Sequence, residues 1–260
     1  MKCSNVNRHS CYRVFSITIA LAAVCAPSLA QDGMTLLHKM QDALGGADRI
    51  AAIRDFDETV SAQTFNAQGA PTGATVRKRM RWIRPNILRL DQVGPGDTYV
   101  LYFDGTGGWE IFPTKTYAVL AGSELQFAKN YLRGLDLNVW LADRDPQFTV
   151  TSPAPNVIDI ADGANAGKKM EFTLDPATFL PFENSAISIS DTGQPIAQEI
   201  HLDRWTAVEG IRFPHRSINI HNGVKRAEIT VGSVKLNGGL NPGDLALKPS
   251  NLAPVMAGNR

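Results

Sequence analysis

The sequence predicts a mainly β protein with a few helices, built on one large, curved antiparallel sheet. Two observations support this fold class. Most of the chain after residue 55 consists of short segments in which apolar and polar residues alternate, separated by glycine, proline or aspartate turns. Two stretches have helical spacing instead, one near the N-terminus and one between blocks of strands. Roughly ten to twelve strands of this kind fit one curved sheet more economically than two separate domains.

The first 30 residues have the pattern of a secretory signal peptide. Basic residues (Lys2, Arg8 and Arg13) precede an uncharged, mostly apolar run over residues 14–25, and small residues follow up to Ala30. The apolar run is shorter than the ~20 residues that a helix needs to cross a bilayer. We therefore expect cleavage before residue 31 and export to the periplasm, or secretion.

Cleavage would change the composition of the chain. All three cysteines (Cys3, Cys11 and Cys25) lie in the removed segment, so the mature protein would have no disulfide, thiol nucleophile or cysteine metal site. Removing three of the 26 basic residues leaves 23 against 25 acidic residues, a balance that does not favour nucleic acid as a partner. We expect one domain over residues 31–249, a flexible tail over 250–260, and a monomer.

The chain is expected to begin with helices and then enter the sheet. Apolar residues recur at helical spacing in MTLLHKMQDALGG, residues 34–46, and Gly45 can form a left-handed C-terminal cap. A short second helix is expected over ADRIAAI, residues 47–53. From Phe56 onward the period shifts to two, which indicates the first strand.

The strand VRKRMRWIR places Arg77, Arg79 and Arg81 on the face opposite its apolar residues. One interpretation is a ridge that binds anions, such as phospholipid head groups or an acidic partner. The other is a solvated outer face whose arginines pair with Asp55 and Asp57 on the preceding strand. The sequence favours the second interpretation.

The stretch FDGTGGWEIFP, residues 103–113, raises the question of a phosphate-binding loop. Its glycine spacing matches neither G-x-G-x-x-G nor the P-loop pattern, and the residues that follow alternate as in a strand rather than starting a helix. Asp-Gly and Gly-Gly pairs suit a tight reversal. We expect a β-hairpin, with Phe103 and Trp109 facing the same apolar interior.

A helical insert is expected between the two blocks of strands, from Ser123 to Ala142. Ser123 and Gln126 have the spacing of a capping box, and Gly134 is expected to break the insert into two helices. The insert could be an ordinary helix packed on the sheet or a lid over a cavity, and the sequence does not decide between them.

The sequence contains no recognisable catalytic or metal-binding motif. G-x-S-x-G and H-E-x-x-H are both absent. His215 and His221 would lie about 20 Å apart on one strand, too far to share a metal ion. Asp104 and Glu110, which flank the hairpin, are more simply explained as solvating the turn. We therefore expect that the protein is not an enzyme and binds no cofactor. The one catalytic alternative that remains is a hydrolase whose motif is not recognised.

The order of several turn and strand motifs resembles the outer-membrane lipoprotein-sorting family of LolA and LolB type. The motifs are RWIRPNILRLDQ, YVLYFDGTGGWEIFP, LDPATFLPFE, VEGIRFPHRSINI and LNPGDLALKPS, and they span most of the mature chain. The resemblance implies an unclosed antiparallel β half-barrel wrapped around helices, with an apolar cavity for acyl chains. Members of the wider group carry lipoproteins or lipids across the periplasm, or sense envelope stress. No cargo-handling arginine of the family can be matched to this chain.

The resemblance and the apolar pattern together predict a ligand cavity, bounded by one face of the sheet and by the helical insert. The expected lining residues are Trp82, Leu88, Leu90, Leu101, Phe103, Trp109, Ile111, Phe127, Tyr131 and Trp140. The expected partners are a lipid or an acylated lipoprotein, with transient contact to membrane-bound envelope proteins and none to nucleic acid. The alternative is an envelope interaction or sensing module whose interior is filled by its own side chains.

Overall fold

The computed structural model describes residues 32–94, 98–165, 169–189 and 194–254. The predicted signal peptide, residues 1–30, lies outside this part of the chain, as do residues 255–260 of the predicted tail. The first residues of that tail are described, and Ala253–Pro254 pairs with a strand of the sheet.

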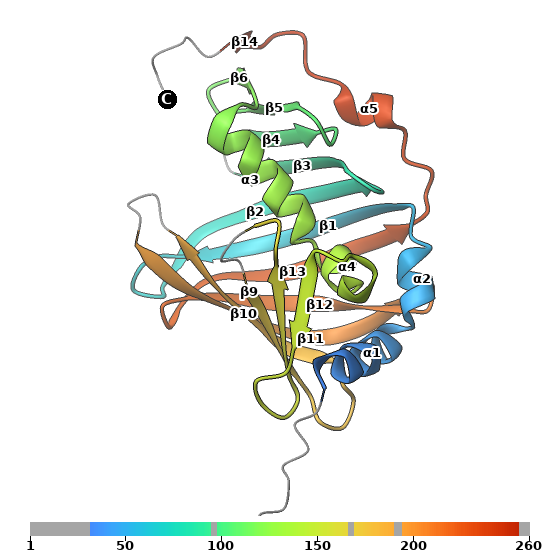
Figure 1. Ribbon diagram of the computed structural model, residues 1–260. Coiled ribbons are helices and arrows are strands. Elements are labelled where there is room, and N and C mark those ends of the chain that lie inside the picture. Colours follow the sequence, from blue (N-terminus) through green and yellow to red (C-terminus); the bar gives the residue numbers. More distant parts are fainter. Residues whose placement is uncertain (1–31, 95–97, 166–168, 190–193, 255–260) are drawn as a thin grey trace, which may run out of the picture.

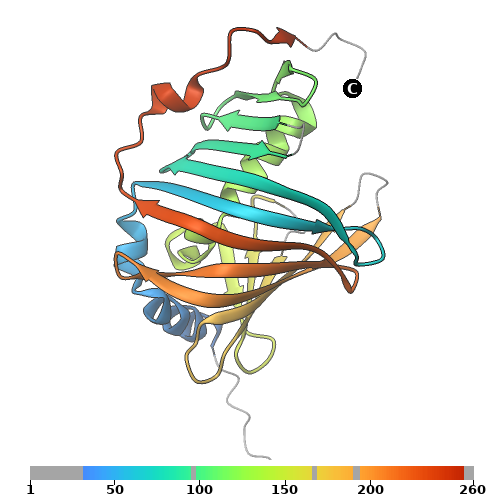
Figure 2. The same cartoon turned by 180° about the vertical axis from the view of Figure 1, so that it is seen from behind.

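One sheet of 14 strands dominates the described residues, in the order β14-β6-β5-β4-β3-β2-β1-β13-β12-β11-β10-β9-β8-β7. Its neighbouring strands are antiparallel except β14 and β6, which are parallel. Strands β14 and β7 form the two edges of this order, so the sheet is open, and Figures 1 and 2 show its curvature. The predicted fold class is therefore confirmed. The strands are β1 (Asp55–Phe65), β2 (Pro71–Ile83), β3 (Ile87–Val93), β4 (Thr98–Phe103), β5 (Gly108–Ile111), β6 (Thr116–Val119), β7 (Phe148–Thr151), β8 (Val157–Asp162), β9 (Lys169–Leu174), β10 (Pro181–Ile189), β11 (Pro195–Val208), β12 (Ile211–His221), β13 (Val224–Leu236) and β14 (Ala253–Pro254).

Helices α1, α3 and α4 lie over the concave face of the sheet, whereas α2 and α5 lie beside the ends of its strands (Figure 1). The helices of the described residues are α1 (Gly33–Leu44), α2 (Ala47–Ala51), α3 (Gly122–Arg133), α4 (Asp136–Val139) and α5 (Pro242–Ala246), with a 3-10 turn at Ala142–Arg144. None of them is long and apolar enough to cross a membrane.

Helix α1 is firmly packed on the sheet. Six of its 12 residues are buried, and it contacts β7, β8 and β12. Gly45 ends the helix with φ 122°, and a Cβ there would lie 2.2 Å from the carbonyl oxygen of Gly210. A side chain cannot fit at this position, so the predicted glycine cap is confirmed together with both N-terminal helices.

The predicted helical insert is also confirmed, with its break. Helix α3 ends at Arg133, and α4 begins after Gly134. The capping box was wrong, because the helix begins one residue earlier than Ser123. Its N-cap is Ala121, which makes no side-chain capping bond.

The apolar core is divided between the two faces of the sheet. The main cluster fills the concave side between the sheet and α1, α3 and α4. A second cluster lies on the convex side of β4 and β5, and its members are Val100, Tyr102, Trp109, Ile111 and Leu245. Leu245 belongs to the C-terminal segment, residues 239–254, which runs from α5 to β14 and covers this second cluster.

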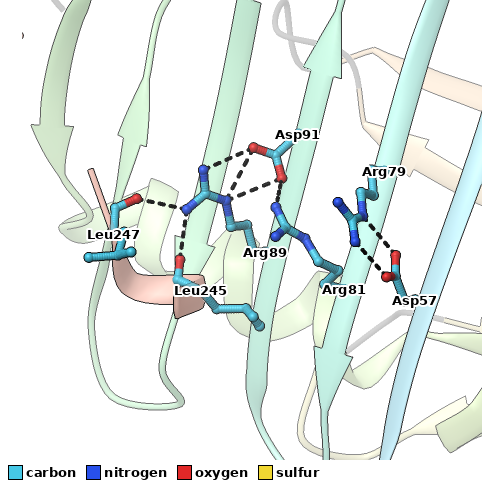
Figure 3. Close-up of polar contacts among 7 residues, drawn as sticks. All are labelled: Asp57, Arg79, Arg81, Arg89, Asp91, Leu245 and Leu247. Carbon is cyan, nitrogen blue, oxygen red and sulfur yellow. Dashed lines mark hydrogen bonds and ion pairs between the residues drawn. The ribbon is translucent and has the colours of Figure 1, made fainter. Parts of the chain in front are cut away.

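Two arginines on the outer face of β2 pair with aspartates of the neighbouring strands (Figure 3). Arg79 binds Asp57 through two hydrogen bonds of 2.8 and 2.6 Å, and this contact holds the pKa of Asp57 below its usual value. Arg81 pairs with Asp91. The interpretation as a solvated, paired face is confirmed for Asp57 but was wrong for Asp55. The carboxylate of Asp55 is buried and instead accepts the backbone N–H groups of residues 238 and 239 at 2.7 and 3.0 Å.

Arg89 attaches the C-terminal segment to the convex face. Its guanidinium donates to the carbonyl oxygens of Leu245 and Leu247 at 2.9 and 2.7 Å and also binds Asp91 (Figure 3). Its position 5.6 Å from the Trp109 ring adds a cation–π contact. Hydrogen bonds from a charged donor contribute about 1.5–3 kcal/mol each.

Replacement of Arg89 by methionine should therefore release the C-terminal segment. We expect chymotrypsin to cleave after Leu247 at least several-fold faster than in the wild type, with a lower thermal midpoint. The matched control is Arg77→Met, an exposed arginine on the same face of the sheet. Equal cleavage rates in Arg89→Met and Arg77→Met would show that Arg89 does not anchor the segment.

Candidate functional site

Cross-strand neighbours form parallel rows on the concave face, and the first row is solidly packed. Phe56, Trp82, Leu88 and Phe103 are consecutive partners across β1 to β4. Each is at most 3% exposed. Because protein interiors pack to crystal-like density, this first row leaves no room for a ligand.

The second row lies one pleat further along the same strands and is less filled. Its members are paired in register from β1 to β5, and they are Glu58, Met80, Leu90, Leu101 and Glu110. Leu101 and Glu110 are buried, whereas the other three are half-buried. With neighbouring strands about 4.8 Å apart, the row is about 19 Å long. It is an apolar floor with a carboxyl group at each end.

Helix α3 covers this second row. The hydroxyl of Tyr131 lies 4.0 Å from the sulfur of Met80, and the rings of Phe127 and Tyr131 are 6.1 Å apart. A helix of 12 residues is about 18 Å long, close to the length of the row. Only Ala128 and Leu132 of α3 are buried, in contrast to six residues of α1. The helix is therefore held to the sheet by a small apolar contact.

A hollow of ≈ 200 Å³ separates α3 from β4 and β5. Phe127 stands at its edge and is 58% exposed. Inside the hollow, the Tyr99 hydroxyl donates to Glu110 at 3.1 Å, and burial raises the pKa of Tyr99. The hollow thus combines an apolar floor with a few polar groups, as ligand pockets commonly do. It is lined by Tyr99, Leu101, Glu110, Leu120, Ser123, Glu124 and Phe127.

The opposite end of the second row contains two half-buried acids, Glu58 and Asp136. Burial, with the negative charge of Asp136 nearby, raises the pKa of Glu58 to about 7. Burial also raises the pKa of Asp136 to about 6. The pKa of Tyr131 rises to about 12 because of burial and of these two carboxyl groups. Lys78 faces the same side of the sheet one row further along, and burial lowers its pKa.

Sequence reasoning missed these two acids, although Glu58 left a signal. It occupies an inward position between Phe56 and Val60, where the alternation of β1 calls for an apolar residue. Asp136 gave no such signal, because its approach to β1 depends on how α4 packs.

The predicted lining residues fall into three groups. Four are fully packed core: Trp82, Leu88, Phe103 and Trp140. Four surround the second row and the hollow: Leu90, Leu101, Phe127 and Tyr131. The remaining two lie on the other face of the sheet: Trp109 and Ile111.

The placement of Trp109 and Ile111 on the cavity side was therefore wrong, although the hairpin itself is confirmed. In an antiparallel pair, directly opposed residues share a face. Trp109 opposes Tyr102, and Ile111 opposes Val100, so both point to the convex side. Phe103 opposes Gly108 instead. Pairing shifted by one residue reverses the face of every side chain on a strand.

The convex side has a hollow of its own, beneath the C-terminal segment. Its volume is ≈ 240 Å³, and Arg89 and Lys115 bring positive charge to it. It is separated from the second row by the thickness of the sheet. Its other lining residues are Thr98, Val100, Ile111, Phe112, Pro113, Pro249, Asn251 and Leu252.

Within the described ranges, no group of three or more histidine, cysteine, aspartate or glutamate side chains is arranged to hold a metal ion. His201 is the histidine with two carboxylates nearby, Glu183 at 3.6 Å and Glu199 at 3.8 Å, and all three are partly exposed on the sheet. The candidate site is the hollow between α3 and strands β4 and β5, together with the part of the second row that continues from it beneath α3. We call this region the groove. The protein is an open antiparallel half-barrel with helices on its concave face and a hollow beneath one of them.

Solved structures share this architecture. No protein-family model and no curated protein sequence matches the chain. An outer membrane lipoprotein-sorting protein domain from Vibrio parahaemolyticus superimposes with a TM-score of 0.52 at 13% identity, over 82% of this chain and 95% of its own. A LolA superfamily protein from Nitrosomonas europaea gives 0.52 at 14% identity, over 84% and 99%. A DUF1329 family protein from Desulfovibrio piger gives 0.53 at 10% identity, over 79% and 95%. The resemblance to LolA-type proteins is thus confirmed for the fold.

Proposed function

We propose that this protein is a periplasmic binding or carrier protein for lipids or for the acyl chains of lipoproteins, without catalytic activity. The acyl chain would lie along the second row, beneath α3. The hollow between α3 and Leu101 carries this proposal, because it opens on the concave side next to half-buried apolar residues. The LolA-type fold and the predicted signal peptide support the cellular location and the class of ligand.

The dimensions of the groove fit one extended acyl chain. The hydrocarbon core of a bilayer is about 30 Å thick, so one leaflet of chains spans about 15 Å. The second row, at about 19 Å, accommodates that length. Burial of each methylene would contribute about 0.8 kcal/mol.

Binding a whole chain requires α3 to move outward. Pockets for small molecules usually enclose about 300–1,000 Å³, whereas the hollow measures ≈ 200 Å³. The small buried contact of α3 permits such a movement, and the deep packing of α1 holds the rest of the concave side in place. In this proposal α3 acts as a lid over the groove, which is one of the two alternatives that the sequence left open for the helical insert.

The alternative function is an envelope interaction or sensing module with no transported cargo. The solid packing of the first row favours it, because Trp82, Leu88 and Phe103 leave no space for a ligand. The two functions differ in whether lipid binds in the groove, which the next experiment decides.

Replacement of Phe127 by aspartate should abolish lipid binding while the fold persists. The side chain is 58% exposed at the edge of the hollow, so a charge there costs little stability but obstructs an acyl chain. The measurement is titration with phosphatidylethanolamine carrying a fluorescent acyl chain, together with native mass spectrometry. The wild type should bind one molecule and Phe127→Asp none.

The matched control is Ile187→Asp, on β10. Ile187 is 59% exposed and lies outside the groove, so its variant should bind lipid as the wild type does. A folded wild type that binds no acyl probe would contradict the proposal and favour the sensing module.

A further inference from the structure

Resting on the proposed function, we infer that the groove selects amphiphiles whose head group carries a protonated amine over those with a net anionic head group. Glu110 and Glu124 are the residues that make this selection, at the end of the groove where the head group would lie.

We place the head group at the end of the groove near Glu110, because this end is open to solvent. Ser123 and Phe127 line the hollow and are exposed to solvent. The opposite end, at Glu58, is covered by Tyr131 and lies next to Asp136 at the start of α4. An acyl chain entering from the open end would therefore point toward Met80 and leave its polar head beside Glu110 and Glu124.

The charges that line the hollow all have one sign. Its ionisable lining residues are Glu110 and Glu124, with the Tyr99 hydroxyl, and none of its lining residues is basic. Glu110 is 8% exposed, so water screens its charge weakly. A head-group ammonium there would gain charge-assisted hydrogen bonds, whereas a phosphate without a compensating amine would be repelled.

The inward-facing Lys78 on β2 does not reverse this sign. Lys78 faces inward in the row that also contains Tyr99, with Gln92 between them. Its own charge is disfavoured by burial, as its lowered pKa indicates. The basic lining residues Arg89 and Lys115 belong to the hollow on the convex side. The two hollows therefore differ in the sign of their charge, and the acidic hollow is the one that adjoins the proposed acyl groove.

The test compares two lipids with identical fluorescent acyl chains, phosphatidylethanolamine and phosphatidylglycerol. The wild type should bind phosphatidylethanolamine about tenfold or more tightly, a difference of about 1.4 kcal/mol. Glu124→Lys should remove or reverse that preference. Its control is Asp42→Lys, which makes the same charge change at an exposed position of α1 and should keep the wild-type preference.

Glu124 also lies in the first turn of α3, where a carboxylate stabilises a helix by interacting with its dipole. The preference between the two lipids distinguishes head-group selection from this structural role. A loss of helix stability would weaken the binding of both lipids equally. Glu110→Gln provides a second variant, which should lower the preference if Glu124→Lys does not fold. Equal affinity of the wild type for the two lipids, or an unchanged preference in both variants, would overturn the inference. Failure of the wild type to bind either lipid would instead reject the proposed function.

Discussion

Replacement of Trp82 by alanine should lower the free energy of unfolding by about 3–5 kcal/mol, the usual cost of removing a large aromatic side chain from a core. Trp82 is 0% exposed and lies in the first row between Phe56 and Leu88. Arg84 stacks on its ring at 4.7 Å, and this cation–π contact would also be lost. The indole N–H has no hydrogen-bond partner, so no hydrogen bond is lost with the ring.

Leu90→Ala is the matched variant in the second row, and it should behave in the opposite way. Leu90 is half-buried, so we expect a stability loss of about 1 kcal/mol but a clear loss of lipid affinity, because part of the groove floor disappears. Urea unfolding and titration with the fluorescent lipid measure both effects. If Leu90→Ala cost as much stability as Trp82→Ala and left binding unchanged, the second row would be core rather than groove.

Replacement of Glu58 by glutamine should stabilise the protein at pH 8 by about 1–3 kcal/mol and change little at pH 5. The folded state raises the pKa of this carboxyl from 4.5 to about 7. Between these values the folded protein holds a proton that the unfolded chain releases, so this group's contribution to stability falls as the pH rises from about 4.5 to about 7. Glutamine resembles the protonated form at every pH and removes that loss.

The groups that face Glu58 determine how large the effect will be. Asp136 and Tyr131 approach from the helices, and Met80 and Val234 are its strand neighbours. Asp136 has a raised pKa of its own, so part of the pH dependence will persist in the variant. Thermal unfolding of the wild type, Glu58→Gln and the exposed turn variant Glu209→Gln at pH 5 and pH 8 measures the effect. Parallel pH profiles for all three would show that Glu58 is not buried in the folded state.

The sequence predicted local structure well because local rules govern it. Alternation identified the strands, helical spacing identified α1 and α3, and the Asp-Gly pair identified the hairpin. The pairing of Arg79 with Asp57 was also predictable, because the two residues lie on strands that follow each other in the chain. These features depend on neighbours in sequence or on adjacent strands.

Features that depend on register or on distant segments could not be predicted. The side of the sheet that Trp109 faces depends on the pairing register of β4 and β5, which composition does not reveal. A register that differs by one residue from the expected one places Trp109 on the convex side. Arg89 bonds to Leu245, 156 positions away, and Asp55 bonds to residue 238, 183 positions away. The candidate groove could not be predicted for the same reason, because Glu58, Leu101 and Phe127 come from three distant parts of the chain.

The location of the acyl chain is the central claim, and photocrosslinking tests it most directly. A phosphatidylethanolamine with a diazirine near the end of one acyl chain would be bound, irradiated and mapped by peptide sequencing in a mass spectrometer. We predict adducts on Met80, Leu90 and Tyr131, the residues at the inner part of the groove, and their loss in Phe127→Asp. Adducts confined to residues 245–252 on the convex side, or no adduct on the folded protein, would contradict the account.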